Sequence, residues 1–322
     1  MKNVEGVNTT PNYWQIDHKV KNIFKEKGVV VLPSSEAWEK FKWVRTYLKR
    51  KPKEGYFIWV KQSVGFPLIT CVSICSSNIF QNLMNLILIE KNVKAEINGF
   101  CNATKKNLCG NHKGHSKIIL KKDSELKMNH FHSWGKKDKV AFRLDFLLKK
   151  GAKLSHNYKC LEIPKKLKTE NNTFLEENSS ANFVTTVLAK NGEVDIYDST
   201  FLNGRKSNGI SRIRMVGDKK SKILAHSKMI ANAAGTGHLD CMGLLLAKNS
   251  NIKAIPELIN KNKNASLTHE ASIGKISEEV LSYLRSRGLT EDEAIDLIVA
   301  GFLGEEEPLI IKGRPISSEL YM

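Results

Sequence analysis

The amino-acid sequence predicts a mainly β protein built around a solenoid, with helical segments at both ends. A strand-like run, a Lys-Asn or Lys-Gly turn and a second short strand recur through the middle of the chain. The turn residues Lys91, Lys122 and Lys150 follow one another at intervals of about thirty residues. Little 3.6-residue periodicity separates these turns, which argues against helices that cross over a βαβ sheet. Helical spacing is confined to the two ends.

The repeat accounts for the expected core, which we place at residues 56–268. Each unit alternates apolar and polar residues and breaks at Gly, Asn or Asp, which tolerate the left-handed turn conformation. One unit cannot bury its apolar face alone, but stacked neighbours build a continuous core. A β-sandwich is the alternative. The units are LILIEKNVKAEI (86–97), IILKKDSELKM (118–128), FLLKKGAKLSH (146–156), TVLAKNGEVDI (186–196), LLLAKNSNIKAI (244–255) and LINKNKNASL (258–267), with the later turns at Lys190, Lys248 and Lys261.

Residues 1–55 are expected to form an N-terminal helical region. The stretches YWQIDHKVKNIFKEKG (13–28) and SSEAWEKFKWVRTYLKR (34–50) both have helical spacing. Ser34 or Ser35 is a suitable N-cap for the second stretch. Its apolar residues fall on one stripe, which consists of Trp38, Phe41, Val44 and Leu48.

Residues 269–322 are expected to form a C-terminal helical domain. Ser277 is positioned to cap ISEEVLSYLRSRG, which stops at Gly288, and Thr290 with Glu293 forms a capping box that opens TEDEAIDLIVAGFLG. Acidic residues are concentrated here, in contrast to the lysine-rich remainder, which suggests a separate module with its own partner. The two helices either cap the solenoid or provide a docking platform.

Charge and hydropathy indicate which kinds of binding partner to expect. The chain carries 51 Lys and Arg against 33 Asp and Glu, a net charge of +18. The lysines are spread along the chain and arginine is scarce, so we expect a solvated basic surface and no nucleic-acid partner. The N-terminus MKNVEGVNTTPNYW lacks the apolar stretch of a signal peptide, and no apolar run is long enough to span a bilayer. We therefore expect a cytoplasmic protein without a membrane partner.

Two groups of candidate metal ligands lie in the first half of the core. CNATKKNLCGNHKGH contains Cys101, Cys109, His112 and His115, a composition that suits zinc in a spacing unlike that of common zinc sites. HFHSW places His130 and His132 on the same face of a strand, where the pair has the chemistry to bind metal. In a solenoid the residues of the first group need not face one point, and for the histidine pair ordinary polar or packed strand positions are the alternative.

A third group joins GTGHLDC, with His238, Asp240 and Cys241, to the pair His269-Glu270. The pair is not the HExxH motif of zinc peptidases, because residue 273 is isoleucine. A thiolate, an imidazole and a carboxylate are suited to iron or an iron–sulfur cluster, or to a Cys-His nucleophile with an acidic orienter. Otherwise Cys241 is a buried small residue and His269 ends a turn.

The segments HLDCMGLLLA and SLTHEASIGKISEEVLSYLRSRGLTEDEAIDLIVAGFLG resemble the core signature of the SufB/SufD family. These proteins are scaffolds of SUF-type iron–sulfur cluster assembly. Weaker similarity extends through NGFCNATKKNLCGNHKG and HFHSWG. The resemblance implies a right-handed parallel β-helix, two scaffold subunits joined through the ends of their β-helices, and a SufC-like ABC ATPase docked on each C-terminal helical domain.

The resemblance also implies the site residues. Cys241, His269 and Glu270 match the family's functional cysteine, histidine and glutamate and are expected to bind a transient iron–sulfur cluster. His238, Cys160, Cys101 and His112 are second-choice ligands, and Cys160 is the nearest candidate for the cysteine that accepts persulfide sulfur.

The chain carries the markers of both SufB and SufD, so we expect a compact homodimer of archaeal type. Such a scaffold would have no catalytic residues of its own, would use ATP only through its partner, and would pass clusters to recipient apoproteins. The rival hypothesis is an enzyme, either a β-helix hydrolase or a Cys-His enzyme that uses Cys241 and His269. Sparse acidic residues in the core argue against the hydrolase.

Overall fold

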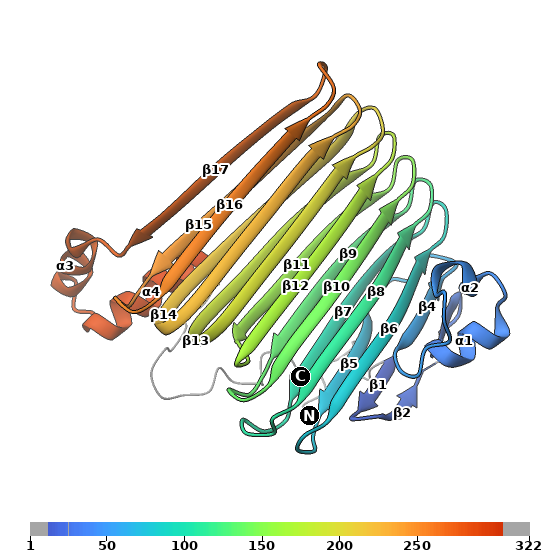
Figure 1. The fold of residues 1–322 in the computed structure, drawn as a ribbon, viewed down its shortest axis with the longest axis horizontal. Helices are drawn as coiled ribbons and strands as arrows, with labels where there is room; N and C mark the ends of the chain where they lie inside the picture. Colours follow the sequence, from blue (N-terminus) through green and yellow to red (C-terminus); the bar gives the residue numbers. More distant parts are fainter. Residues whose placement is uncertain (1–11, 25, 305–322) are drawn as a thin grey trace.

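The computed structural model describes residues 12–24 and 26–304 and is mainly β, as expected. The chain winds through about eight turns of a flattened solenoid, in which two parallel sheets lie face to face (Figure 1). Each turn contributes one strand to each sheet, and successive turns pair in register along nearly their whole length. Backbone hydrogen bonds therefore run along the solenoid axis and connect every turn to the next.

We call the two sheets A and B. Sheet A consists of β1 (Tyr13–Ile16), β5 (Leu68–Ile74), β7 (Lys94–Ala103), β9 (Glu125–Ser133), β11 (Lys153–Glu162), the first parts of β13 (Ser180–Leu202) and β14 (Ser207–Ala231), β15 (Gly235–Leu245) and β17 (Ser266–Lys275). Sheet B consists of β3 (Val29–Pro33), β4 (Tyr56–Val60), β6 (Phe80–Ile89), β8 (Asn111–Leu120), β10 (Lys139–Leu148), β12 (Lys166–Leu175), the second parts of β13 and β14, and β16 (Asn251–Asn260).

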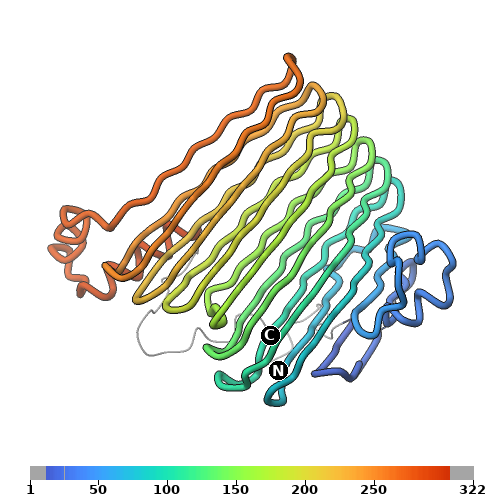
Figure 2. Tube along the Cα trace, in the orientation of Figure 1, coloured from blue at the N-terminus to red at the C-terminus, as the bar shows by residue number. Residues whose placement is uncertain are grey.

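The corners from sheet B to sheet A form a row at one edge of the solenoid (Figure 2). Several of them contain a residue with positive φ, which gives the sharp left-handed turn that the corner requires. These residues are Asn92, Asp123, Gly151, Asn178 and Lys206.

The predicted turns at Lys91, Lys122, Lys150 and Lys261 lie in this row of corners. Lys190 and Lys248 instead mark the opposite edge, where sheet A passes to sheet B. The later intervals are irregular because Lys-Asn turns occur at both edges. At Lys190 the chain bends without ending the strand, so β13 spans both sheets.

The core lies between the two sheets. Side chains alternate inward and outward along each strand, and the inward rows form one continuous cluster of buried residues from β1 to β16. This is the stacked core that the repeat predicts.

The N-terminal region differs from the expected helical region. Residues 13–28 do not form a helix: β1 and β2 (Lys19–Ile23) form an antiparallel hairpin that turns at Asp17, where φ is 51°. The prediction was wrong here because edge pairing of β1 with β5 and burial of Tyr13 override the helical spacing.

The second predicted helix is present in two pieces, α1 (Ser34–Lys40) and α2 (Val44–Tyr47). Ser34 begins the helix but does not cap it, because its hydroxyl donates to the carbonyl of Met84 in β6. The predicted apolar stripe packs on the outer face of sheet B, around Phe57, Leu86 and Leu88. Both short helices therefore cover the first turns of the solenoid from outside.

The C-terminal helices are α3 (Glu278–Ser286) and α4 (Glu291–Leu303). The capping box of Thr290 and Glu293 is confirmed, with both reciprocal hydrogen bonds present. Helix α4 packs on the outside of the solenoid against Leu188, Val216 and Leu244, whereas α3 has no buried residue. The expected boundary between residues 268 and 269 falls inside β17, which continues to Lys275. Predicted features in residues 1–11 and 305–322 lie outside the described residues.

Among residues 12–24 and 26–304, none of the helices has the length and apolar character needed to cross a membrane.

Candidate functional site

The register of the last two strands of sheet A places Cys241, His269 and Glu270 at the C-terminal end of the solenoid. Leu239 in β15 lies opposite His269 in β17, and Cys241 lies opposite Ala271. Because side chains alternate along a strand, His269 shares the inward row of Leu239 and Cys241. Cys241 and His269 therefore share one side of the sheet, on neighbouring turns and two residues apart along the strand direction.

Glu270 lies on the other side of the sheet. It is opposite Asp240, whose carboxylate accepts two hydrogen bonds from the Arg214 guanidinium at 2.9 and 2.6 Å. His238 is also in an outward row, and its Nδ1 is 2.7 Å from Thr268 Oγ1. The structure thus separates Glu270 and His238 from the inward pair within one chain.

Cys241 is fully buried, and its thiol donates to Ser227 Oγ at 3.7 Å. Burial raises the pKa of this thiol, and the carboxylates of Asp198 and Asp240 act in the same direction, whereas Arg214 opposes them. A nucleophilic cysteine needs the opposite shift and a nearby base. The raised pKa of the Cys241 thiol therefore does not favour the Cys-His enzyme hypothesis.

A polar group lies in the interior next to Cys241. Asp198 in β13 accepts from Asn171 Nδ2 at 2.8 Å and from Ser211 Oγ at 3.5 Å, and it is the register neighbour of Ser227. Burial without a cation raises the pKa of Asp198 to about 6. The interior of the C-terminal turns is therefore more polar than a simple apolar stack.

The zinc array proposed from CNATKKNLCGNHKGH is not assembled. Cys109 is exposed at a corner, and the His115 ring donates to Asp145 on the outer face at 2.7 Å. His112 is buried, with Nδ1 2.8 Å from Gln81 Oε1. Cys160 is buried too, and its thiol donates to the carbonyl of Glu162 at 3.5 Å.

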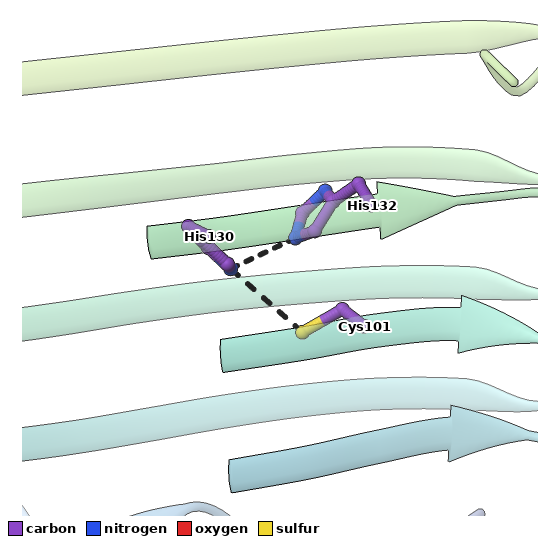
Figure 3. A group of neighbouring side chains, drawn as sticks. All are labelled: Cys101, His130 and His132. Atoms are coloured by element: carbon purple, nitrogen blue, oxygen red, sulfur yellow. Dashed lines mark hydrogen bonds between the residues drawn. The ribbon is translucent and has the colours of Figure 1, made fainter. Parts of the chain in front are cut away.

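Cys101 meets His130 and His132 instead (Figure 3). The Cys101 sulfur lies 3.8 Å from His130 Nε2, and that nitrogen lies 2.9 Å from His132 Nε2. Cys101 is in β7 and both histidines are in β9, the adjacent strand of sheet A. All three side chains lie in inward rows, and their ligand atoms fall within 4.8 Å of one another.

Burial governs the ionisation of this second cluster. It lowers the pKa of His130 to about 4 and lowers that of His132 well below the ordinary value, so both imidazoles are neutral near pH 7. It also raises the pKa of the Cys101 thiol.

All three residues are candidate metal ligands in the sequence, but there they fall into two separate groups. A signal was available: His130 and His132 follow Cys101 by 29 and 31 residues, which is the length of one solenoid turn. In a parallel solenoid, residues one turn apart become lateral neighbours.

The solenoid defines a β-helical protein whose interior holds thiol and imidazole side chains suited to binding metal. Residues 72–302 match the family described as "SUF system FeS cluster assembly, SufBD core domain". The chain therefore belongs to the SufBD family of iron–sulfur cluster assembly proteins, as the resemblance indicated.

Curated relatives include an iron-sulfur cluster assembly SufBD family protein of Archaeoglobus fulgidus. It is 33% identical over 93% of this chain and 84% of the relative. A homologue from Methanothermobacter thermautotrophicus strain Winter is 32% identical over 77% of this chain and 62% of its own length. A relative from Methanocaldococcus jannaschii is 26% identical over 79% of each chain.

Proposed function

We propose that this protein is a homodimeric scaffold on which iron–sulfur clusters are assembled before transfer to apoproteins. The observation that carries the proposal is the position of Cys241 and His269 in neighbouring inward rows at the exposed C-terminal end of the solenoid. A thiolate and an imidazole are ligands that suit iron in a cluster. The cluster is the cargo of the scaffold and not its resident cofactor.

A second copy of the chain would complete this site. Strand β17 is exposed along most of its length, and Ile273 in its inward row is 42% exposed. An exposed strand with an apolar inward row is a suitable surface for pairing with another subunit. A two-fold axis at this end would bring two copies of Cys241, His269 and Glu270 to one interface. The Glu270 side chain faces outward in one chain, but at such an interface it would lie close to the site that the two chains share.

The C-terminal helices supply the proposed ATPase contact. Helix α3 has no buried residue, and its Tyr283 side chain is 57% exposed. The helix also exposes Val280 (45%), and an exposed aromatic side chain beside an exposed apolar one is typical of a contact surface. We assign this surface to a SufC-like ABC ATPase, whose ATP hydrolysis would drive rearrangement of the scaffold.

Anaerobic reconstitution of the full chain with ferrous iron and sulfide tests the scaffold proposal. Wild type is expected to retain iron and acid-labile sulfide through gel filtration and to show cluster absorption and Mössbauer signals. Cys241→Ala should lose most of this cluster, and His269→Ala and Glu270→Ala should weaken its retention. Cys75→Ala is the matched control, because Cys75 is a half-buried free thiol at the opposite end of the solenoid. Identical clusters in wild type and Cys241→Ala would refute the ligand assignment.

Co-purification tests the ATPase contact separately. The scaffold is mixed with the SUF-type ABC ATPase of the same organism and analysed by gel filtration. Tyr283→Asp is expected to abolish co-elution while leaving cluster retention intact. Trp14→Asp, at the opposite end of the molecule, should leave co-elution unchanged. Unchanged co-elution of Tyr283→Asp would move the contact away from α3.

A further inference from the structure

We propose that Cys101, His130 and His132 form a mononuclear site for a divalent transition metal ion, zinc or iron(II), in the interior of the solenoid. The site is separate from the cluster-binding end and goes beyond the proposed scaffold function. Its three donors come from two adjacent turns, β7 and β9.

The spacing of the donors fits one ion. Zinc lies about 2.0–2.1 Å from imidazole nitrogen and about 2.3 Å from thiolate sulfur, so tetrahedral ligands stand roughly 3.3–3.6 Å apart. The corresponding separations are 2.9 Å between the two imidazole nitrogens and 3.8 Å between Cys101 sulfur and His130 Nε2. All three ligand atoms lie within 4.8 Å of one another, so side-chain movements of about 1 Å would bring them to tetrahedral separations.

The donor chemistry selects the class of metal. One thiolate and two imidazoles favour zinc and iron(II) over magnesium or calcium, which prefer oxygen ligands. The ring of Phe142 packs 5.3 Å from the His130 ring and 4.9 Å from the His132 ring, which keeps the surroundings apolar. Three protein ligands leave one tetrahedral position for water or another small ligand.

The backbone holds the ligands in place before any metal binds. Cys101 lies directly opposite His132, and Gly99 lies opposite His130. A Cβ at Gly99 would lie 3.5 Å from His130 Cδ2, an ordinary van der Waals contact, so position 99 borders the His130 ring directly. Strand positions of this kind hold ligands more accurately than loops do.

The surroundings also orient the second histidine. Tyr158 Oη lies 3.2 Å from His132 Nδ1, which fixes the ring and leaves Nε2 for the metal. Within the part of the chain that the structure describes, His130 Nδ1 is buried without a hydrogen-bond partner, so the polar contacts of this ring are those at Nε2. A hydrogen bond between the two histidines uses only one of their Nε2 lone pairs, whereas a metal ion would use both.

Cobalt(II) titration of the chelator-treated full chain, without sulfide, tests the site. Wild type is expected to bind one equivalent per chain, with thiolate-to-cobalt charge transfer and the visible bands of tetrahedral cobalt. Cys101→Ser should lose the charge transfer, and His132→Gln should weaken binding by at least about tenfold. Cys71→Ser is the matched control, because Cys71 is a half-buried thiol on the adjacent strand β5 and should leave the spectrum unchanged. Displacement of cobalt by zinc and by iron(II) would show which of the two binds more tightly.

Two further measurements distinguish this metal site from the proposed cluster site and from a failure of the variants to fold. Cys241→Ala should retain the cobalt spectrum while losing the cluster, which separates this site from the scaffold proposal. Where a ligand variant fails to fold, the rate of cysteine alkylation in the wild type, measured with and without zinc, tests the site instead. Zinc should protect Cys101 while Cys109, exposed at a corner, reacts at an unchanged rate. Absence of thiolate charge transfer together with absence of protection at Cys101 would overturn the proposal.

Discussion

The first and last turns of the solenoid differ in how far other parts of the chain cover them. At the N-terminal end the β1–β2 hairpin and β3 add antiparallel strands to the first turns, Tyr13 is completely buried, and α1 and α2 pack on the outer face of sheet B. At the C-terminal end β17 is the last strand of sheet A, and its residues are mostly exposed. Helices α3 and α4 follow β17, but α4 packs on the outer face of the solenoid and not across this end.

This difference indicates that the C-terminal end of the solenoid is the more suitable surface for association. A solenoid needs a cap at each end to cover its core. The N-terminal hairpin supplies one cap, and we propose that a second subunit covers the end next to Cys241. Breaking the cap should therefore cost folding stability, whereas changing the open end should cost association.

The largest effect is expected at the closed end. Tyr13→Ala removes a buried ring that packs 5.4 Å from the Tyr56 ring and a hydroxyl that donates to Gln15 Oε1 at 2.7 Å. The free energy of unfolding should fall by about 3–5 kcal/mol, measured by urea denaturation. Trp14→Ala, one residue along and partly exposed, serves as the control and should cost much less. Equal losses in both variants would show that β1 is not a cap.

The interior near the open end should give a pH-dependent effect. The pKa of Asp198 is raised from 3.8 to about 6, so folding favours the protonated acid. The stabilisation is complete below pH 3.8 and is lost as pH rises through 6, an effect of roughly 3 kcal/mol.

Asp198→Asn keeps the hydrogen bond from Asn171 and removes the titration. The difference in unfolding free energy between this variant and wild type should therefore grow between pH 4 and pH 7. A pH-independent difference, measured by urea denaturation at each pH, would contradict the assignment. Asp195→Asn, on an outward position of the same strand, is the control.

A smaller effect on stability but a clear effect on association is expected at the open end. Ile273→Lys places a charge on the exposed inward row of β17, so dimer dissociation should become at least about tenfold easier. Sedimentation equilibrium measures the change. Thermal unfolding of the variant at low concentration should match that of monomeric wild type. An unchanged dimer would place the subunit interface elsewhere.

The smallest effect is expected at the C-terminal helices. Thr290→Ala removes the capping box of α4, and the loss should be about 1 kcal/mol. Hydrogen exchange should speed up in residues 290–303 and remain unchanged in the solenoid. Ser286→Ala, whose hydroxyl donates to the carbonyl of Tyr283 at the end of α3, is the control. Faster exchange throughout the chain would mean that α4 also supports the solenoid.

The repeating part of the fold was predictable, because each turn repeats the same alternation and the same corner residues. The capping box was predictable for a similar reason, since it depends on residues only three positions apart. The N-terminal hairpin was not predictable from periodicity: residues 13–28 have helical spacing, and only the pairing of β1 with β5 decides their structure. Local patterns do not encode such long-range pairing.

The candidate sites also differ in whether a local sequence pattern or long-range strand pairing defines them. Cys241, His269 and Glu270 were named from one contiguous signature, and their role as ligands stays a prediction. The meeting of Cys101 with His130 and His132 depends on the exact register between β7 and β9, which a sequence pattern of about thirty residues leaves uncertain by one or two positions. A shift of one residue would turn these side chains to the outer face.

The uniform stacking of turns also fixes a length. Five strand steps separate Cys101 in β7 from Cys241 in β15, which at about 4.8 Å per step is roughly 24 Å along the axis. The number of turns therefore sets the distance between the two thiols. Removal of one complete turn between them would shorten this distance by a single strand step and leave the residues around each thiol unchanged.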